Sequence, residues 1–306
     1  MSAPLRVIRP LAVTPAMLLD TNVPLDDCPA WDGNAVYATG AQVLETSPAR
    51  PVTTIYESVQ DGNVGRQPSQ NPDWWLEVGP ANRWLALDNS YSTQTAQAGL
   101  IRYVIKPGQS VGAIAALNLT NHGAFGVTMT NDDGRIVYER FTHPEALQAP
   151  ADWYCWFFGA RTVPDMRLLE DLPPYPNATI TVEIHGGDTL AVGVLLLGQE
   201  VRLGVGVQWG ARVELVDYSI KQTDEYGDTK LLQRAWATRA SFNVLLSRGE
   251  FDAMLAFGRD VRALPCLWIV SDMYDSTVIY GFWKGITQTI SYPNRTDCSL
   301  DIEGLT

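Results

Sequence analysis

Three histidines, His122, His143 and His185, are the chain's whole supply of imidazole groups for acid–base or nucleophilic chemistry. A hydrolytic triad places a histidine beside an acid and a serine or cysteine nucleophile. The chain has no Gly-x-Ser-x-Gly segment of the kind that exposes a nucleophilic serine. His185 is followed by two glycines and Asp188, which is typical of a turn at the end of a strand. The sequence therefore predicts no triad.

Paired acidic residues could also do chemistry, because glycosidases cleave sugars with two carboxylates. The chain has adjacent acids at Asp26-Asp27, Asp132-Asp133 and Glu170-Asp171. Neighbouring acids in turns are usually solvated, and nothing in the sequence marks one of these pairs as catalytic. We therefore expect a protein that is not an enzyme, with a polysaccharide hydrolase as the alternative.

Metal and cofactor sites also lack a sequence signature. The chain has four widely separated cysteines, without a Cys-x-x-Cys pair: Cys28, Cys155, Cys266 and Cys298. We expect them to be small buried residues. The segment Gly204–Gly210 is rich in glycine, but Arg212–Ile220 after it alternates like a strand, whereas a dinucleotide loop leads into a helix. We expect neither a metal nor a cofactor.

Aromatic side chains are dense between residues 28 and 80 and could fill a small core or bind a ligand. We expect Trp31, Tyr37, Tyr56 and Trp75 to be mostly core residues. Trp74 is adjacent to Trp75, and side chains alternate between the two faces of a strand. The sequence therefore predicts that Trp74 has the more exposed ring.

Several short motifs occur in a fixed order along this segment: Ala30-Trp31, Tyr37-x-x-Gly40-x-x-Val43, Tyr56-x-Ser58, Asn63-x-Gly65-x-x-Pro68, Trp74-Trp75 and Val78-Gly79. Their order resembles the chitin-binding type 3 modules, the carbohydrate-binding modules of families five and twelve. The resemblance implies that exposed aromatic rings stack on sugars, with Trp74, Trp31, Tyr37 and Tyr56 as candidates. The segment departs from these modules in a longer Glu45–Thr54 loop and in its second tryptophan.

Composition divides the chain into four parts and indicates a mainly β protein. Residues 1–27 form a proline-rich extended arm, and residues 28–80 form the carbohydrate-binding-like module. Residues 81–205 contain frequent strands and turns, which is typical of a β-sandwich or jelly roll. Residues 206–306 combine strands with one helix, which indicates an α+β antiparallel sheet.

The third part contains the clearest strand patterns. Leu100–Ile105 is apolar and β-prone, and Asn131–Gly134 predicts a hairpin turn between Phe125–Thr130 and Arg135–Arg140. Two further strands are expected. Ala178–His185 alternates between apolar and polar residues, with Ile180, Val182 and Ile184 on one face. Thr189–Leu197 is almost entirely apolar, which predicts a strand buried on both faces.

The run Asp152–Phe158 is apolar on both faces if it is extended. Alternation would place Trp153, Cys155 and Phe157 on one face and Tyr154, Trp156 and Phe158 on the other. A strand of this kind is either buried on both sides or contacts another subunit, so Trp156 is a candidate interface residue.

The fourth part has a strand at Arg239–Leu246, a capping box at Ser247–Glu250 and a helix that ends near Val261. Three further strands are expected at Cys266–Val270, Thr277–Tyr292 and Cys298–Ile302, the second long enough to bend or bulge. This order resembles the distal-tail and tail-tube proteins of bacteriophages, which assemble into rings around the tail channel.

The resemblance implies that residues 206–306 are the assembly domain. The strands Leu267–Val270 and Val278–Phe282 are expected to have edges that pair with a neighbouring subunit, with Trp268 and Ile279 as candidate interface residues.

Charge and hydropathy restrict the partners. The net charge is −12 and the chain has four lysines, which disfavours nucleic acid. No apolar run reaches the roughly 18 residues of a membrane span, and Met1–Pro10 does not have the pattern of a signal peptide. We therefore expect synthesis in the host cytoplasm.

The favoured hypothesis is a structural component of a phage tail tip or baseplate in the virion. It would form a homo-oligomeric ring with other tail proteins and present a module to a host cell-surface glycan. The alternatives are a chitin-like polysaccharide hydrolase and a secreted carbohydrate-binding protein.

Overall fold

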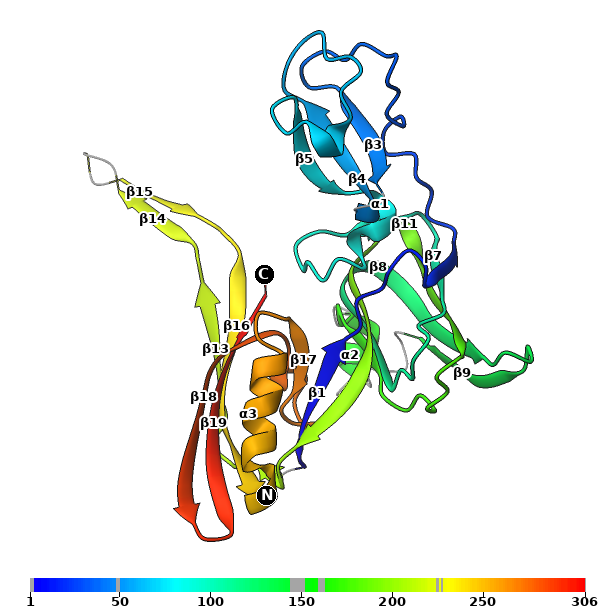
Figure 1. Cartoon of the computed structure of the whole chain (residues 1–306). Coiled ribbons are helices and arrows are strands. Elements are labelled where there is room, and N and C mark those ends of the chain that lie inside the picture. The colour runs from blue at the N-terminus through cyan, green and yellow to red at the C-terminus, as the bar shows by residue number, and fades with distance from the viewer. Residues whose placement is uncertain are drawn as a thin grey trace. The chain divides into compact units, whose positions relative to one another are not determined.

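The computed structural model describes residues 3–47, 50–143, 152–158, 163–223, 226 and 228–305. The chain divides into two compact units, one formed by Met1–Leu11 with Gly198–Thr306 and the other by Ala12–Leu197. Antiparallel strands dominate both units, with one longer helix near the C-terminus (Figure 1). The mainly β fold class is therefore confirmed.

The small aromatic module, residues 28–80, lies in the second unit. Its sheet has the order β3-β4-β5, formed by Gln42–Ser47, Arg50–Ser58 and Trp75–Pro80. One face of β3 packs Val43 against Tyr56 and Trp75. The next residue, Leu44, packs on the other side with Ala81 and Trp84 of the short helix α1 (Asn82–Leu85). The sheet therefore lies between two apolar clusters.

The segment Glu45–Thr54 is not the long loop that the sequence suggested. β3 continues to Ser47 and β4 begins at Arg50, with Glu45 opposite Thr54 in the ladder. The prediction failed because Pro51 lies at the start of β4, before the ladder with β5 begins at Thr54, where a proline is tolerated.

The rest of the second unit is a larger antiparallel sheet. Its strands are β2 (Leu18–Thr21), β6 (Thr95–Ala96), β7 (Leu100–Ile105), β8 (Ala113–Thr130), β9 (Ile136–Thr142), β10 (Arg167–Leu169) and the first part of β11 (Thr179–Leu203). β11 pairs with β7 and lies beside β8, which also pairs with β9 and β10.

The strand predictions for this sheet are confirmed. β7 spans Leu100–Ile105, and the β8–β9 hairpin turns at Asn131–Gly134. Gly134 has a φ of +77°, which few residues other than glycine adopt, and the Asn131 side chain accepts a bond from the Arg135 amide at 2.9 Å. Ile180, Val182 and Ile184 are buried, as the alternation predicted.

The predicted turn at His185–Asp188 is wrong, because β11 continues through it. Gly186 and Gly187 lie against Asn121 of β8, and a Cβ on either glycine would come within 2.4 Å of an Asn121 atom. The two glycines therefore allow a close approach between strands. Glycine pairs of this kind resemble a turn signal when only the local sequence is considered.

The segment Trp153–Phe158 is the short helix α2 and not a strand. The amide of Trp156 donates to the carbonyl of Asp152 at 3.1 Å, the i to i−4 bond of a helix. Alternation could not distinguish the two states because every residue of the run is apolar. The Cys155 side chain lies outside the described part of the chain, whereas Cys266 and Cys298 are buried and Cys28 is half-buried.

The first unit contains a second antiparallel sheet around the C-terminal helix. Its elements are β1 (Leu5–Pro10), β12 (Gly206–Val207), β13 (Arg212–Asp217), β16 (Trp236–Ser247), η3 (Arg248–Glu250), α3 (Phe251–Asp260), β17 (Cys266–Ile269), η4 (Asp275–Thr277), β18 (Val278–Tyr292) and β19 (Arg295–Gly304). The end of β11 leads into the order β1-β17-β18-β19-β16, after which β12 and β13 both pair with β16.

The capped helix is confirmed. The Ser247 amide donates to the Glu250 carboxylate at 2.8 Å, and the Ser247 hydroxyl donates to the same oxygen at 2.7 Å. Met254 and Val261 then pack into the core of this unit. The expected irregularity of β18 is a register shift between Trp283 and Gly285.

The strands expected to offer free edges are interior strands, so this prediction was wrong. β17 pairs with β1 on one side and β18 on the other, and β18 also pairs with β19. Trp268 is 0% exposed and donates its indole N–H to the Gly281 carbonyl at 3.0 Å, while Ile279 is 4% exposed. The edge of β17 is covered by β1, which lies some 260 residues away in the sequence.

The proline-rich lead, residues 1–27, contributes a strand to each unit. β1 pairs with β17 and with residues Gly198–Leu203 of β11, whereas β2 pairs with β7. The unit boundary at Leu197 lies a few residues before the division expected at residue 205.

Candidate functional site

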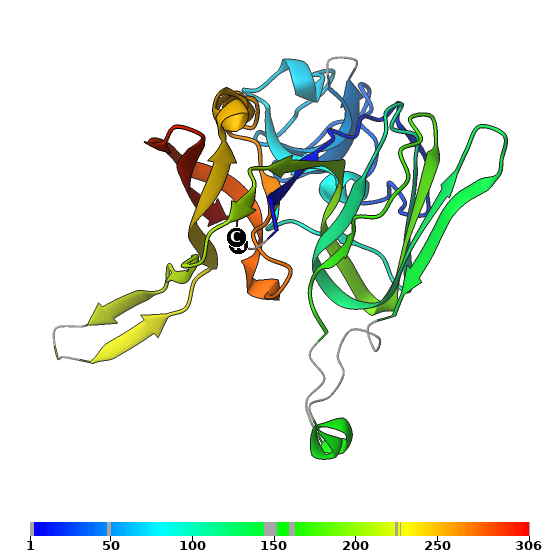
Figure 2. The same ribbon diagram turned by 90° about the horizontal axis from the view of Figure 1, so that it is seen from below.

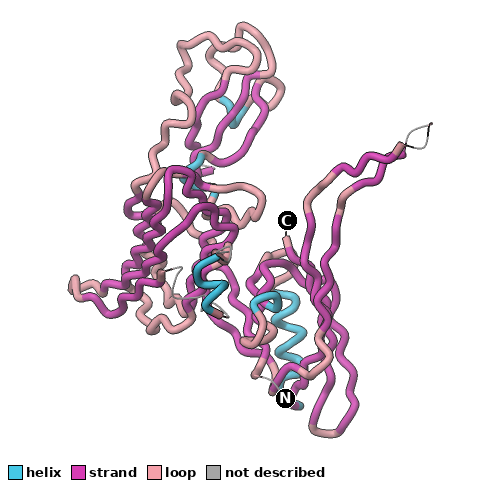
Figure 3. Tube along the Cα trace, turned by 180° about the vertical axis from the view of Figure 1, so that it is seen from behind, coloured by secondary structure: helices cyan, strands magenta, loops and turns pink. Residues whose placement is uncertain are grey.

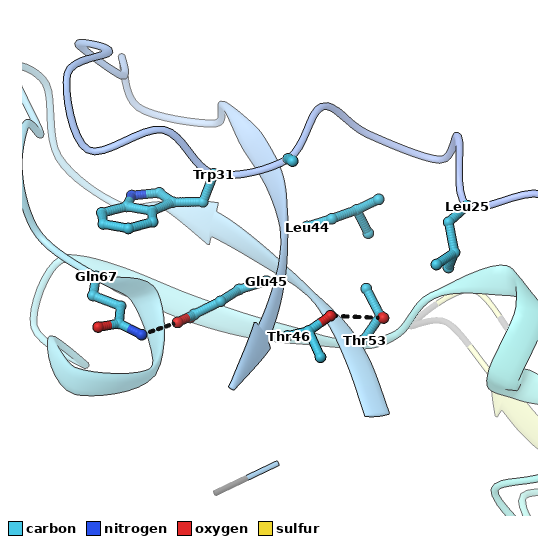
Figure 4. A pocket seen from close by; sticks show the side chains of 8 residues that line it. Leu25, Trp31, Leu44, Glu45, Thr46, Thr53 and Gln67 are labelled. Carbon is cyan, nitrogen blue, oxygen red and sulfur yellow. Dashed lines mark hydrogen bonds between the residues drawn. The ribbon is translucent and has the colours of Figure 1, made fainter. Parts of the chain in front are cut away.

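A hollow of about 450 Å³ opens on the small aromatic module (Figure 4). Its lining combines one aromatic ring with hydroxyl, amide and carboxylate groups and two leucines: Leu25, Ala30, Trp31, Leu44, Glu45, Thr46, Thr53 and Gln67. These residues come from β3, β4 and two loops, so the sheet fixes the polar groups at the base of the hollow.

Glu45 organises the polar side of this hollow although it is only 7% exposed. Its Oε1 accepts bonds from the Gln67 amide at 2.5 Å and from the Ser69 hydroxyl at 3.0 Å. Its Oε2 accepts the Ser69 backbone N–H at 2.7 Å. These contacts hold the 3-10 turn η1 (Pro68–Gln70) against β3 and fix the Gln67 amide in position.

Trp31 forms the aromatic wall. Its backbone N–H donates to the Leu44 carbonyl at 2.9 Å, and the Leu44 N–H donates to the Pro29 carbonyl at 2.9 Å, so the residue is anchored beside β3. Its indole lies above the Glu45–Gln67 pair in Figure 4. The indole Nε1 is buried without a hydrogen-bond partner, which leaves one donor of the aromatic wall unsatisfied.

Thr46 and Thr53 complete the polar row, with their hydroxyl oxygens 2.9 Å apart across the β3–β4 ladder. Leu25 and Leu44 supply apolar surface beside them (Figure 4). A flat ring beside a short row of fixed polar groups can stack on the apolar face of a sugar and bond its hydroxyls.

Trp74 is half-buried and so is more exposed than Trp75, which is 2% exposed, as the sequence predicted, but its ring does not line the hollow. It lies in the turn before β5, not on the strand, and packs against the same cluster as Trp75. The Arg66 guanidinium lies 3.3 Å from the centre of its ring. Strand alternation is not the cause of this difference, because only Trp75 of the pair belongs to β5.

Tyr37 and Tyr56 belong to the module's core and do not line the hollow. Tyr37 meets Trp75 edge to face, with ring centres 5.2 Å apart, and its hydroxyl accepts the Asp32 amide at 2.7 Å. Tyr56 is buried between Val43 and Trp75. Of the four candidate sugar-binding residues, Trp31 therefore lines the hollow.

Sequence reasoning missed Glu45 and Gln67. One signal for Glu45 was present, because it follows Val43 by two residues and so shares the buried face of β3. A carboxylate on a buried face needs partners. Its partners Gln67 and Ser69 are more than 20 residues away and could not be assigned from the sequence.

A second exposed feature is the projecting hairpin, formed by β14 (Ile220–Thr223) and β15 (Thr229–Leu232). It extends away from the sheet of its own unit (Figure 3). Every residue of both strands is exposed, including Leu231 at 79%. Within the described part of the chain, the two strands pair only with each other.

A buried basic pair lies on β8 and β10. His122 and Arg167 are both buried, and neither His122 Nε2 nor the Arg167 guanidinium nitrogens have a hydrogen-bond partner. Burial, and then the charge of Arg167, lower the pKa of His122 to about 4, although Asp165 opposes the shift. His122 is therefore neutral near pH 7.

Among the described residues, no group of three or more His, Cys, Asp or Glu side chains is placed to hold a metal ion. No helix within the described ranges is long and apolar enough to cross a membrane.

No protein-family model matches the chain, and neither a curated protein nor a solved structure shows significant similarity to it.

Proposed function

We propose that the protein is a structural component of a bacteriophage tail tip or baseplate, which forms a ring with copies of itself and with other tail proteins. The strand, capped helix and strand order of residues 206–306, which resembles distal-tail proteins, supports this proposal. The observation that carries it is the projecting hairpin.

An isolated two-stranded hairpin is at best marginally stable in water. The projecting hairpin has two unpaired edges, and Leu231, Leu232 and Ile220 are exposed on it. An exposed strand edge offers unpaired N–H and C=O groups with which another chain can pair. A neighbouring subunit would supply that cover and would bury the leucines.

Charge favours a second copy of the chain as that neighbour. Residues 218–223 and 229–236 contain Lys221, Lys230 and Arg234, whereas the intervening residues 224–228 contain three acids, Asp224, Glu225 and Asp228. The complete chain carries a net charge of −12 and only four lysines, two of which are in this hairpin. A basic stem on an acidic protein complements the acidic surface of the next copy.

The test is the oligomeric state of Leu231→Asp. The buried charge should prevent assembly of the purified chain, measured by analytical ultracentrifugation, without changing its thermal unfolding. Ile290→Asp is the matched control, because Ile290 is 74% exposed on β18 of the same unit and outside the hairpin. Equal loss of assembly in both variants, or a monomeric wild-type chain at high micromolar concentration, would contradict the proposal.

We also propose that the small aromatic module binds a surface glycan in the hollow beside Trp31. The ring of Trp31 and the fixed Glu45, Gln67, Thr46 and Thr53 groups support this second role. A stacking contact contributes about 1 kcal/mol, so a single site binds weakly and a ring of copies binds through multivalency.

Titration of the whole chain with N-acetylglucosamine oligomers tests this role. Trp31→Ala should abolish binding. Trp74→Ala should bind as the wild type does, because in the wild type the Trp74 ring is covered by Arg66. Gln67→Ala also changes the lining of the hollow but retains the aromatic core, so it should weaken binding without unfolding the module. Loss of binding in Trp74→Ala alone would place the sugar elsewhere on the module.

We expect no turnover of the glycan. Reproducible release of reducing sugar that disappears in Glu45→Gln would instead make the hollow the active site of a hydrolase.

A further inference from the structure

The helix α2 exposes five aromatic side chains within six residues. Trp153, Tyr154, Trp156, Phe157 and Phe158 are between 57% and 73% exposed. Four of these rings contact one another: Tyr154 lies 5.1 Å from Phe158 and 6.3 Å from Trp153, and Phe157 lies 6.4 Å from Phe158, measured between ring centres. Figure 2 shows α2 standing apart from the strands of its own unit.

The aromatic residues surround most of the helix. At 3.6 residues per turn, positions 153, 154, 156, 157 and 158 cover an arc of about 200°. A helix that docks on a protein surface through one face has an apolar stripe only about 100° wide. A single groove would therefore leave about half of these rings in water.

The side-chain chemistry also differs from that of a packed protein interface. The five residues are tryptophan, tyrosine and phenylalanine, without an aliphatic residue or a charge between Trp153 and Phe158. Tryptophan and tyrosine have apolar rings with one polar atom, and they concentrate where lipid headgroups meet the hydrocarbon. A bilayer interface surrounds an inserted segment and covers all the rings together.

We propose that α2 is an interfacial anchor that inserts into the headgroup region of a lipid bilayer. Six residues at a rise of about 1.5 Å per residue span about 9 Å, which is far shorter than the roughly 30 Å hydrocarbon core of a bilayer. The anchor lies in one face of the bilayer and does not cross it. This inference is independent of the ring proposed above.

The charge of the chain specifies the lipid. With a net charge of −12 the protein is repelled by anionic headgroups, so aromatic insertion and not electrostatic attraction must supply the affinity. Binding to zwitterionic phosphatidylcholine should therefore equal or exceed binding to phosphatidylserine mixtures. It should also persist at high salt, because salt screens charge and not apolar burial.

Flotation of the whole chain with phosphatidylcholine vesicles tests the proposal. The wild type should float with the vesicles at low and high salt. The double variant Trp153→Ser with Trp156→Ser should lower the partition coefficient by about tenfold or more, since each substitution removes a large buried apolar surface.

The matched control is Trp209→Ser with Trp236→Ser. Trp209 and Trp236 are 75% and 57% exposed, against 73% and 57% for Trp153 and Trp156, and they lie in the first unit. This control should float as the wild type does, and so should Leu231→Asp, which separates lipid binding from ring assembly.

Three results would overturn the proposal. The first is a wild-type chain that remains with the lipid-free fractions. The second is an equal loss of flotation in the Trp209 and Trp236 control, which would indicate general aromatic adhesion. The third is loss of self-association without lipid in the Trp153 and Trp156 variant, which would identify α2 as a contact between copies of the chain.

Discussion

The small aromatic module and α2 both have a high density of aromatic side chains, but they place them in opposite environments. In the module, Tyr56 and Trp75 are buried against β3 and their neighbours contribute hydrogen bonds, such as the 2.9 Å bond from Trp75 Nε1 to the Arg66 carbonyl. In α2, Tyr154 and Phe158 contact each other, and all five aromatic side chains are more than half exposed. Composition therefore does not decide whether an aromatic residue stabilises the fold or is available to a partner, because burial decides it.

The largest effect expected from this comparison is the loss of Trp75. It is 2% exposed and packs with Val43 and Tyr56 in an apolar cluster of the module. Trp75→Ala should destabilise the second unit by about 3–5 kcal/mol, measured by chemical denaturation. A loss below about 1 kcal/mol would show that the module does not depend on its aromatic core.

A pH titration sharpens the same comparison with a buried polar ring. Burial lowers the pKa of His122 in the folded chain to about 4. As the pH falls, the unfolded chain therefore protonates this histidine near pH 6.5, whereas the folded chain protonates it only near pH 4. Stability should therefore be complete above pH 6.5 and decrease as the pH falls to 4, by at most about 3 kcal/mol.

The matched variant is His122→Gln, which cannot take up the proton. Denaturation of both proteins at pH 7, 5.5 and 4 isolates the histidine contribution, because all carboxylates are shared. Parallel curves for the two proteins would mean that His122 titrates normally in the folded chain.

Arg66 over Trp74 represents an intermediate case, a ring that is partly covered by a cation. Arg66→Met keeps the aliphatic stem and removes the charge, so it should cost about 0.5–1 kcal/mol of stability. A double-mutant cycle with Trp74→Leu should recover this amount as the coupling energy. Zero coupling would show that the guanidinium does not interact with the ring in solution.

The smallest effect is expected for α2. Phe158 is exposed and contacts its helical neighbours, so Phe158→Ala should change the free energy of unfolding by less than about 0.5 kcal/mol. Thermal unfolding beside Trp75→Ala gives the direct comparison. Destabilisation of more than about 2 kcal/mol would mean that α2 is packed in solution and would remove the contrast between the two regions.

The amino-acid sequence by itself determined the local elements. Alternation identified the buried face of Ile180, Val182 and Ile184, and Asn131–Gly134 identified a hairpin turn. The Ser247–Glu250 capping box identified the start of the C-terminal helix. Each signal lies within a few residues, and its physical cause, a turn, a cap or a pleat, acts over the same range.

Only the tertiary structure decided which of these elements face water. β1 pairs with β17 and so covers the strand of Trp268, although the two lie at opposite ends of the chain. Glu45 meets Gln67 and Ser69 across the module, and Asn121 meets the glycines of β11. The uniformly apolar run Trp153–Phe158 satisfies both helical and extended periodicities, so its state depends on hydrogen bonds and not on its pattern. Strand pairing and burial depend on contacts between segments that are distant in the sequence. A local pattern does not specify which distant segment will pack against it.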